Sequence, residues 1–208
     1  MSCKEQLSSI LEAFEKRGIR THLSDDRKGA LTKCLEFVEG HETVALGGSS
    51  TLAEIGLPES LEKAGVDVFK RPPRDRFPDF RYMEMRKSLM VDVMYSSANA
   101  VTRDGRILNI DGYGNRVSSH IFGPKRVVIV VGYNKITGTL AEAYYRVKNI
   151  ASPPNVRRLE TGAPCGENDY CTDCLGHPGR ICGYVVEFQN VRFRDRVHLI
   201  MVNERLGF

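Results

Sequence analysis

The sequence has no long apolar run and little excess of charge of either sign. No stretch of about 18 apolar residues occurs, so the sequence predicts no membrane-spanning helix. The net charge is only +4, from 30 basic and 26 acidic residues. Proteins that bind nucleic acids usually carry a much stronger basic bias. The sequence therefore predicts neither a membrane-spanning protein nor a nucleic-acid-binding protein.

The N-terminal residues lack the apolar segment of a secretory signal, and the sequence contains no internal repeat and no low-complexity tract. We therefore expect a cytoplasmic, reducing environment, in which the six cysteines are thiols or metal ligands rather than disulfides. The 208 residues, 41% of them hydrophobic and 27% charged, suit one folded domain with a sizeable core.

Alternating helical and strand patterns indicate an α/β protein. The predicted helices cover residues 2–17, 24–39, 50–61 (interrupted near Gly56 and Pro58), 79–89 and 139–150; the predicted strands cover residues 43–46, 66–69, 92–95 and 126–132. Asp104–Gly105 joins two short strands as a hairpin. The unbroken β-branched run that begins at Arg126 predicts a central parallel strand.

These elements predict one domain, residues 1–208, of three α/β/α layers around a mainly parallel sheet. We divide it into N-terminal helices (residues 1–40), an α/β core (41–150), a cysteine-rich loop (163–183) and two C-terminal strands within residues 183–203. The C-terminal strands, 183–188 and 197–202, are expected to pair as an edge hairpin. Residues 70–78 are expected to form a loop, and basic residues continue to Lys87 either as a solvated face or to attract an anion.

A glycine-rich turn follows the strand at residues 43–46. Gly47, Gly48, Ser49, Ser50 and Thr51 lie between this strand and a helix. Glycines allow close backbone approach, and free N–H groups and hydroxyls can bind an anion. The turn predicts a phosphate or carboxylate site; the alternative is a plain turn with serine caps.

Polar residues after other strands are further candidate ligand contacts. These are Asn99, Asp111, Asn115 and Arg116, because such residues build crevices at the carboxyl edge of a parallel sheet. Glu54, Asp111 and His120 are the candidate acid–base groups. The alternatives are a favourable charge on a first helical turn, a tight turn, and a hydrogen-bonded structural histidine.

Four cysteines form the most specific pattern. Cys165, Cys171, Cys174 and Cys182 have the spacing C-x5-C-x2-C-x7-C, with glycines and prolines between them. Four thiolates complete a zinc site or an iron–sulfur cluster, and the spacing does not decide between the two. Two disulfides or four incidental thiols are the alternatives. Cys34 falls on a buried helix face and is interpreted as a packing residue.

Several of these motifs resemble the LUD-domain (lactate-utilisation) family. They are residues 44–57, 97–100, 111–117 and 131–136, and the tail that includes residues 164–182 and 206–208 resembles a subgroup with four cysteines. The resemblance implies a fold similar to the ribose-5-phosphate isomerase, glucosamine-phosphate isomerase and CoA-transferase group, whose members bind phosphorylated or CoA-linked ligands beside a glycine-rich loop.

The resemblance implies an accessory or electron-transfer subunit in the oxidation of L-lactate to pyruvate, and for that reason favours an iron–sulfur cluster (4Fe–4S) over zinc on the four cysteines. Its partners would be a small anionic ligand and other lactate-utilisation subunits, with a homo-oligomer left open. One alternative is an isomerase- or transferase-like enzyme that acts on a small phosphorylated or CoA-linked substrate and carries structural zinc. Another is a ligand-sensing protein without catalysis.

Overall fold

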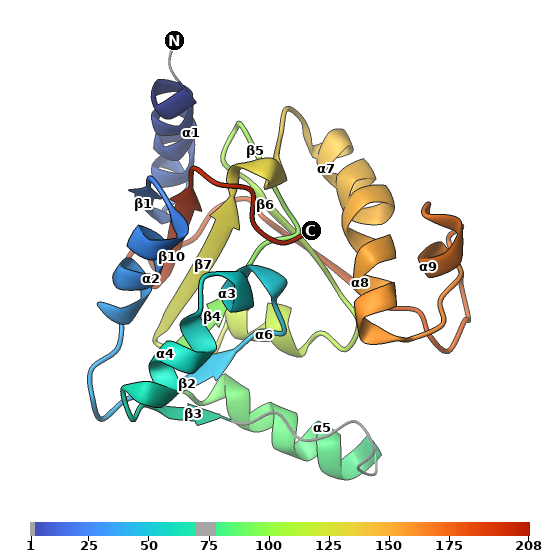
Figure 1. Cartoon of the computed structure of the whole chain (residues 1–208), viewed down its shortest axis with the longest axis horizontal. Helices are drawn as coiled ribbons and strands as arrows, with labels where there is room; N and C mark the ends of the chain where they lie inside the picture. The colour runs from blue at the N-terminus through green and yellow to red at the C-terminus, as the bar shows by residue number, and fades with distance from the viewer. Residues whose placement is uncertain (1–2, 70–77) are drawn as a thin grey trace.

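A six-stranded sheet forms the centre of the fold (Figure 1). The computed structural model describes residues 3–69 and 78–208, with side chains for 6–69 and 82–208. The strands are ordered β1 (Arg20–Ser24), β10 (Val197–Val202), β7 (Arg126–Gly132), β4 (Val93–Ser96), β2 (Thr43–Leu46) and β3 (Asp67–Phe69), and every pair is parallel. The β-branched strand β7 lies between β10 and β4, which confirms its predicted central position.

A second, smaller sheet packs beside the first. Its order is β8 (Ile136–Thr137), β5 (Ala100–Thr102), β6 (Ile107–Asp111) and β9 (Tyr184–Phe188). Strands β5 and β6 form the antiparallel hairpin predicted around Asp104–Gly105. The sequence did not predict that this hairpin belongs to a separate sheet.

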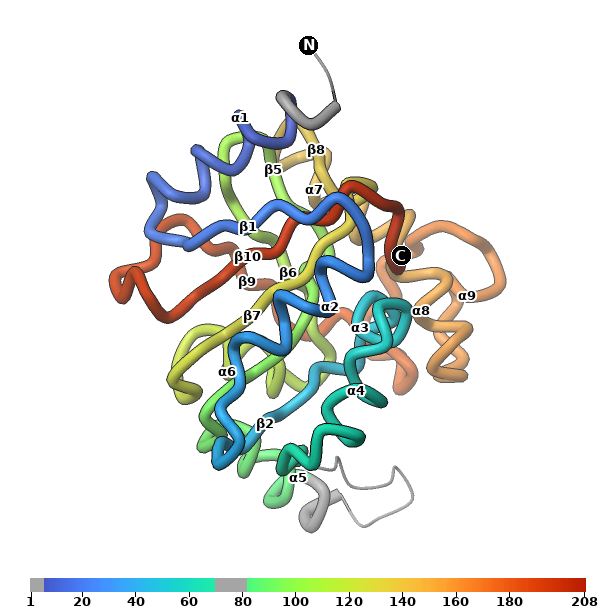
Figure 2. Tube along the Cα trace, turned by 60° about the vertical axis from the view of Figure 1, so that its left-hand side comes forward, coloured from blue at the N-terminus to red at the C-terminus, as the bar shows by residue number. Residues whose placement is uncertain are grey.

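Helices and the small sheet cover the two faces of the large sheet (Figures 1 and 2). The helical elements are α1 (Cys3–Lys16), α2 (Arg27–Leu35), α3 (Ser50–Glu54), α4 (Leu57–Lys63), α5 (Pro78–Arg86), η1 (Lys87–Leu89), α6 (Asn115–Ile121), η2 (Tyr133–Lys135), α7 (Leu140–Arg146), η3 (Val147–Ala151), α8 (Ser152–Leu159) and α9 (Cys165–Asn168). None of the described helices is long and apolar enough to cross a bilayer.

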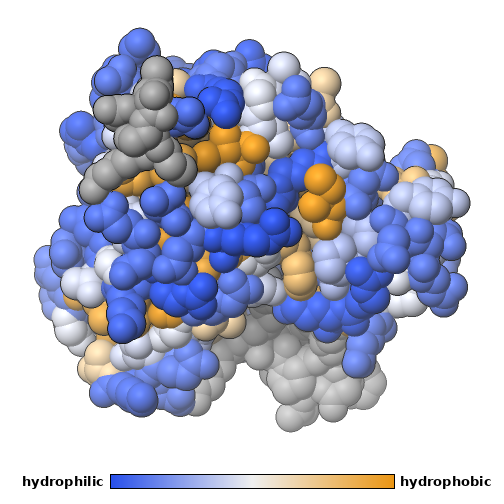
Figure 3. Space-filling model, turned by 45° about the horizontal axis from the view of Figure 1, so that its top comes forward, coloured by the Kyte–Doolittle hydropathy of each residue, from blue (hydrophilic) through white to orange (hydrophobic). Residues whose placement is uncertain are grey.

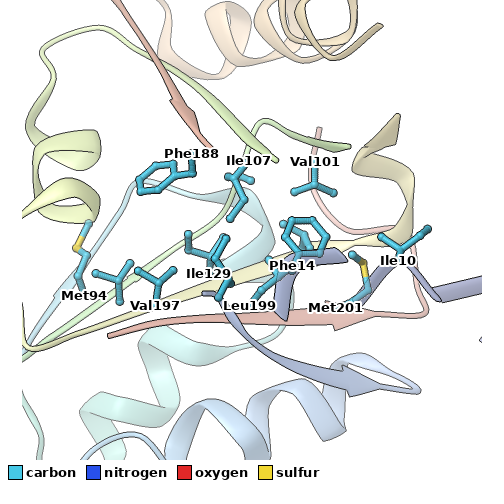
Figure 4. Close-up of a cluster of buried hydrophobic side chains, with 14 of the residues drawn as sticks. Ile10, Phe14, Met94, Val101, Ile107, Ile129, Phe188, Val197, Leu199 and Met201 are labelled. Atoms are coloured by element: carbon cyan, nitrogen blue, oxygen red, sulfur yellow. The ribbon is translucent and has the colours of Figure 1, made fainter. Parts of the chain in front are cut away.

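The core has two main parts, one on each face of the large sheet. On one face α2, α3 and α4 pack against the sheet, and buried Cys34 belongs to this part, as predicted. On the other face α1 and the small sheet supply the apolar side chains. Figure 4 shows Phe14, Ile107 and Phe188 packed over Ile129 and Leu199 of the large sheet. The face shown in Figure 3 is mainly hydrophilic, with apolar side chains in small groups.

The N-terminal region contains a strand that the sequence analysis missed. Residues 20–24 form β1, and the following helix begins at Arg27 rather than at Ser24. Asp26 fixes this start because its carboxylate accepts a hydrogen bond from the Gly29 N–H at 2.7 Å. β1 forms because β10, far along the chain, provides its pairing partner.

The two C-terminal strands form as predicted, but they do not pair with each other. β9 pairs with β6 in the small sheet, whereas β10 lies between β1 and β7 in the large one. The predicted edge hairpin is therefore corrected. All but one of the residues of β10 are buried, as expected for an inner strand of a parallel sheet covered on both faces.

The helix predicted over residues 139–150 forms as α7 and η3. Tyr144 and Val147 were expected to face inward; Val147 is buried, as are Ala143 and Arg146, but Tyr144 is exposed. Pro153 and Pro154 were expected to end the regular structure, but both lie in the first turn of α8, where a missing N–H costs little. The predicted loop over residues 70–78, and Arg71, Arg74 and Arg76 within it, lie almost wholly outside the described residues.

Tyr95 provides a test of this packing. Its buried hydroxyl donates a hydrogen bond to the Cys34 carbonyl at 2.6 Å and so joins β4 to α2. We expect Tyr95→Phe to lower the free energy of unfolding by about 0.5–1.5 kcal/mol, because the carbonyl loses its buried donor. Urea unfolding measures the loss. The matched variant Tyr145→Phe, at an exposed position, should leave stability unchanged; equal effects of the two variants would contradict the assigned contact.

Candidate functional site

A cavity of about 670 Å³ lies where β2, β4 and β7 end. Its lining includes residues that follow each of these strands: the glycine-rich turn after β2, Ser97 after β4 and Lys135 after β7. Residues from the end of β6 to the start of α6, among them Asp111 and Arg116, form another wall. Ligands bind at this carboxyl edge in many open α/β sheets. The cavity is thus the candidate ligand site.

Most of the predicted ligand contacts line this cavity. They are Gly48, Ser49, Ser50, Thr51, Asn99, Asp111, Asn115 and Arg116. Gly47 is not among the lining residues; a Cβ there would lie 3.0 Å from the Ser96 Oγ and 3.4 Å from the Arg116 side chain. Gly47 therefore allows the turn to pack closely against β4 and Arg116.

Arg116 holds the cavity walls together. Its guanidinium donates to the Ser97 carbonyl at 3.1 Å, to the Asn99 side-chain oxygen at 3.0 Å and to the Ile110 carbonyl at 3.1 Å. It also forms a 3.4 Å ion pair with Asp111, whose carboxylate accepts the Val117 N–H. Four of its donors are thus used by the protein, so Arg116 organises the wall that a ligand would contact.

The other two candidate acid–base residues are placed outside the lining. The Glu54 carboxylate accepts the Gly207 N–H at 2.9 Å and is otherwise exposed. His120 is fully buried in α6, with its ring 6.1 Å from that of Phe188. Burial, with Arg116 and Arg196 nearby, lowers the pKa of His120 well below its usual value. His120 is therefore not placed to exchange a proton directly with a ligand in this cavity.

Lys135 is the lining residue that the sequence analysis missed. It is only 4% exposed, and its Nζ donates to the Thr51 Oγ1 at 2.8 Å and to the Ser97 Oγ at 2.9 Å. Burial, then the charges of Arg146 and Arg116, lower its pKa to about 7. Its position directly after the central β-branched strand was the signal available in the sequence.

The last residues pass beside this lysine. The Asn134 side chain accepts the Leu206 N–H at 3.0 Å and donates to the Gly207 carbonyl at 3.3 Å. Gly207 has φ +61°, and a Cβ there would lie 2.5 Å from the Thr51 Oγ1. Only glycine suits this position, so the segment can lie directly against Thr51, with Phe208 in the cavity lining.

The four predicted cysteine ligands gather on the far side of one cavity wall. All four line a small space of about 10 Å³, close to the volume that one water molecule needs. Burial, and then the proximity of the other three thiols, raises the pKa of Cys165. Across residues 6–69 and 82–208 no three Cys, His, Asp or Glu side chains are arranged to hold a metal ion. The structure therefore brings the donors together without a preformed metal geometry.

Basic and acidic groups surround these thiols. Lys148 and Arg180 both line the small space and pair with Asp173 at 3.5 and 3.2 Å. The Ser152 Oγ lies 3.6 Å from the Cys182 Sγ. Positive charge near a thiol favours the thiolate. The donor set thus fits a metal that binds thiolates. A cluster of several metal ions is larger than the space of about 10 Å³, so it would require the loop to open.

Comparison with solved structures agrees with this fold. The chain is similar to a DUF162 family protein from Deinococcus radiodurans, with a TM-score of 0.54, 16% identity and coverage of 98% of this chain and 99% of that one. A ribose-5-phosphate isomerase A from Neisseria gonorrhoeae gives a TM-score of 0.35 at 17% identity, over 55% and 54% of the two chains. A search of curated proteins found no match.

A scan against protein families gives one match that spans nearly the whole chain. The LUD domain matches residues 7–202. This range contains the glycine-rich turn, both sheets, the cavity wall at Arg116 and all four clustered cysteines. The chain therefore belongs to the LUD domain family, the lactate-utilisation type that its motifs resemble.

Proposed function

We propose that the protein is a lactate-utilisation subunit that binds a small organic anion in the cavity and carries one metal centre on its four clustered cysteines. Its role would be accessory or electron-transferring in the oxidation of L-lactate to pyruvate, together with other subunits of the same process. Membership of the LUD domain family supports the process. The observation that carries the proposal is the wall that the cavity and the cysteine site share.

Four residues make this shared wall. Ser152, Arg180, Ile181 and Cys182 line both the 670 Å³ cavity and the small space among the thiols. Cys182 is itself one of the four donors, so a ligand in the cavity would lie one side chain away from the centre. A four-thiolate iron–sulfur cluster supplies one-electron transfer. Such a short separation is what electron transfer between a bound ligand and that centre would need.

The chain's own residues have distinct parts in this proposal. The thiols of Cys165, Cys171, Cys174 and Cys182 hold the metal. Lys148 and Arg180 offset the negative charge of the thiolates. Arg116, held by four protein acceptors, fixes the wall beside the anion. The glycine-rich turn gives a ligand close access to the backbone.

A structural zinc site in an isomerase- or transferase-like enzyme is the second candidate. The specific observation in its favour is the size of the space among the thiols, about 10 Å³, which suits a single ion. Zinc with four thiolates acts as a structural clip. The cavity would then hold a phosphorylated or CoA-linked substrate.

Calorimetry distinguishes these functions. Anaerobically prepared protein is titrated with L-lactate, pyruvate, inorganic phosphate and CoA. We expect saturable binding of lactate or pyruvate. Binding of phosphate or CoA alone would favour the second candidate and contradict the first.

Gly48→Val tests whether the cavity is the binding site. Gly48 lines the cavity, so the added side chain takes room from the ligand. We expect affinity to fall about tenfold or more, with little change in stability. Gly40→Val is the matched control, because a Cβ at Gly40 meets no atom within 4 Å. Equal ligand affinity in the two variants would place the ligand elsewhere.

A further inference from the structure

We propose that Lys135 is a reactive amine that forms a reversible imine with a 2-oxo acid bound in the cavity. The inference rests on the proposed function for the class of ligand, a small carboxylate with a neighbouring carbonyl such as pyruvate. It goes beyond that function because it assigns covalent chemistry to one side chain.

The Lys135 amine is held by two hydroxyl groups and not by an ion pair. The Thr51 hydroxyl can donate to the Leu206 carbonyl at 3.5 Å, and the Ser97 hydroxyl can donate to the Ala98 carbonyl at 3.3 Å. Both hydroxyls can then accept from the Lys135 Nζ. These two hydrogen bonds use two of the three hydrogen-bonding positions on Nζ. The structure shows no third partner for Nζ among residues 6–69 and 82–208.

The charges around Lys135 favour the neutral amine. Arg146 on α7 and Arg116 on α6 both lower its pKa, and burial lowers it further. Glu54 on α3 acts in the opposite direction, but its carboxylate binds the Gly207 N–H. No carboxylate forms an ion pair with Nζ within the described part of the chain. With a pKa of about 7, a large fraction of Lys135 has a free lone pair at neutral pH.

The cavity also contains positive charge for the carboxylate of an oxo acid. Arg158 and Arg180 line the same cavity as Lys135, and their positive charge attracts a carboxylate. Lys135 itself lies in the same lining, beside the hydroxyls of Thr51 and Ser97. The cavity thus offers one bound oxo acid both positive charge for its carboxylate and an amine for its carbonyl.

The step balances without any oxidant. The Nζ lone pair attacks the carbonyl carbon, a C–N bond forms and the C=O π bond breaks. One amine proton passes to the carbonyl oxygen, by way of the adjacent hydroxyls of Ser97 and Thr51, and gives a carbinolamine. The second amine proton passes to the carbinolamine hydroxyl, which leaves as water when the C–O bond breaks, and the C=N bond of the imine remains. Hydrolysis reverses each step and releases the oxo acid and the amine unchanged.

Reductive trapping tests the proposal. The full chain is incubated with pyruvate and cyanoborohydride at pH 7, and the adduct is located by intact mass and peptide mapping. We expect one stable adduct per chain, on Lys135, and at least about tenfold faster labelling there than at exposed Lys125, since more of the Lys135 amine is uncharged. Absence of an adduct on Lys135, or equal rates at the two lysines, overturns the proposal.

Two variants provide the controls. Lys135→Met removes the amine while keeping a side chain of similar length, so the adduct should disappear. Lys125→Met, whose lysine is 75% exposed, should leave labelling at Lys135 unchanged. Should Lys135→Met fail to fold, the peptide map of the unaltered chain decides alone.

The test of the imine and the tests of the proposed function can fail independently of each other. A protein that carries metal and binds pyruvate, but shows no adduct at Lys135, keeps the proposed function and overturns this inference. A protein that is labelled at Lys135 but holds no metal keeps the inference and overturns the metal centre.

Discussion

The double substitution Cys171→Ser, Cys174→Ser is expected to remove the bound metal almost completely. These two cysteines are two of the four donors around one small space, and serine hydroxyls are poor replacements for thiolates. Ordering a loop of this length costs about 1–2 kcal/mol per residue, and residues 163–183 have few apolar side chains to offset the cost. Loss of the metal should therefore loosen this segment.

The α/β core should survive the same substitution. The cysteine segment packs as a small separate cluster around Val156 and Ala163, away from the two main parts of the core. Metal analysis, and limited proteolysis of residues 163–183, measure the two effects. Cys3→Ser is the control, because it leaves the four clustered cysteines intact. Full metal content in the double variant would contradict the assignment.

Gly132→Ala is expected to destabilise the protein and to weaken ligand binding. Gly132 ends β7, and a Cβ there would lie 2.5 Å from the Asn134 Oδ1 and 2.6 Å from both the Glu204 carbonyl oxygen and the Leu206 nitrogen. Two of these three atoms are backbone, so they cannot move aside easily. Overpacking of this kind costs about 1–3 kcal/mol.

The binding effect follows from what the displaced segment contacts. Residues 204–208 contact Asn134, Thr51 in the cavity lining, and Glu54 outside it. Urea unfolding and calorimetry with pyruvate measure both losses. Gly40→Ala is the matched control, because its new methyl group meets nothing within 4 Å. Stability of Gly132→Ala within about 0.5 kcal/mol of the unaltered chain would show that the segment is not held as described.

Local patterns were enough to predict the central elements. The β-branched run at β7, the glycine-rich turn after β2 and the Asp104–Gly105 hairpin each depend on neighbouring residues, and each forms as predicted. The predicted ligand contacts converge on one cavity because the carboxyl ends of parallel strands meet at one edge. The four cysteines also lie around one small space, as their spacing in the sequence predicted.

Long-range pairing was not predictable from the same patterns. β1 forms only because β10 lies beside it, and β10 joins the middle of the sheet rather than pairing with β9. Lys135 was missed because its burial depends on Thr51, Ser97 and the last residues of the chain. A lysine in a sequence is usually exposed, and no local pattern showed that these segments enclose this one.

The metal content of anaerobically prepared protein tests the central claim most directly. The account predicts that iron and acid-labile sulfide are present in matching amounts on the four clustered cysteines, in a protein whose colour bleaches on reduction. Stoichiometric zinc without sulfide would keep the metal site but contradict the electron-transfer role. Less than about a tenth of an equivalent of every metal, under conditions that retain bound metal, would contradict the metal centre itself.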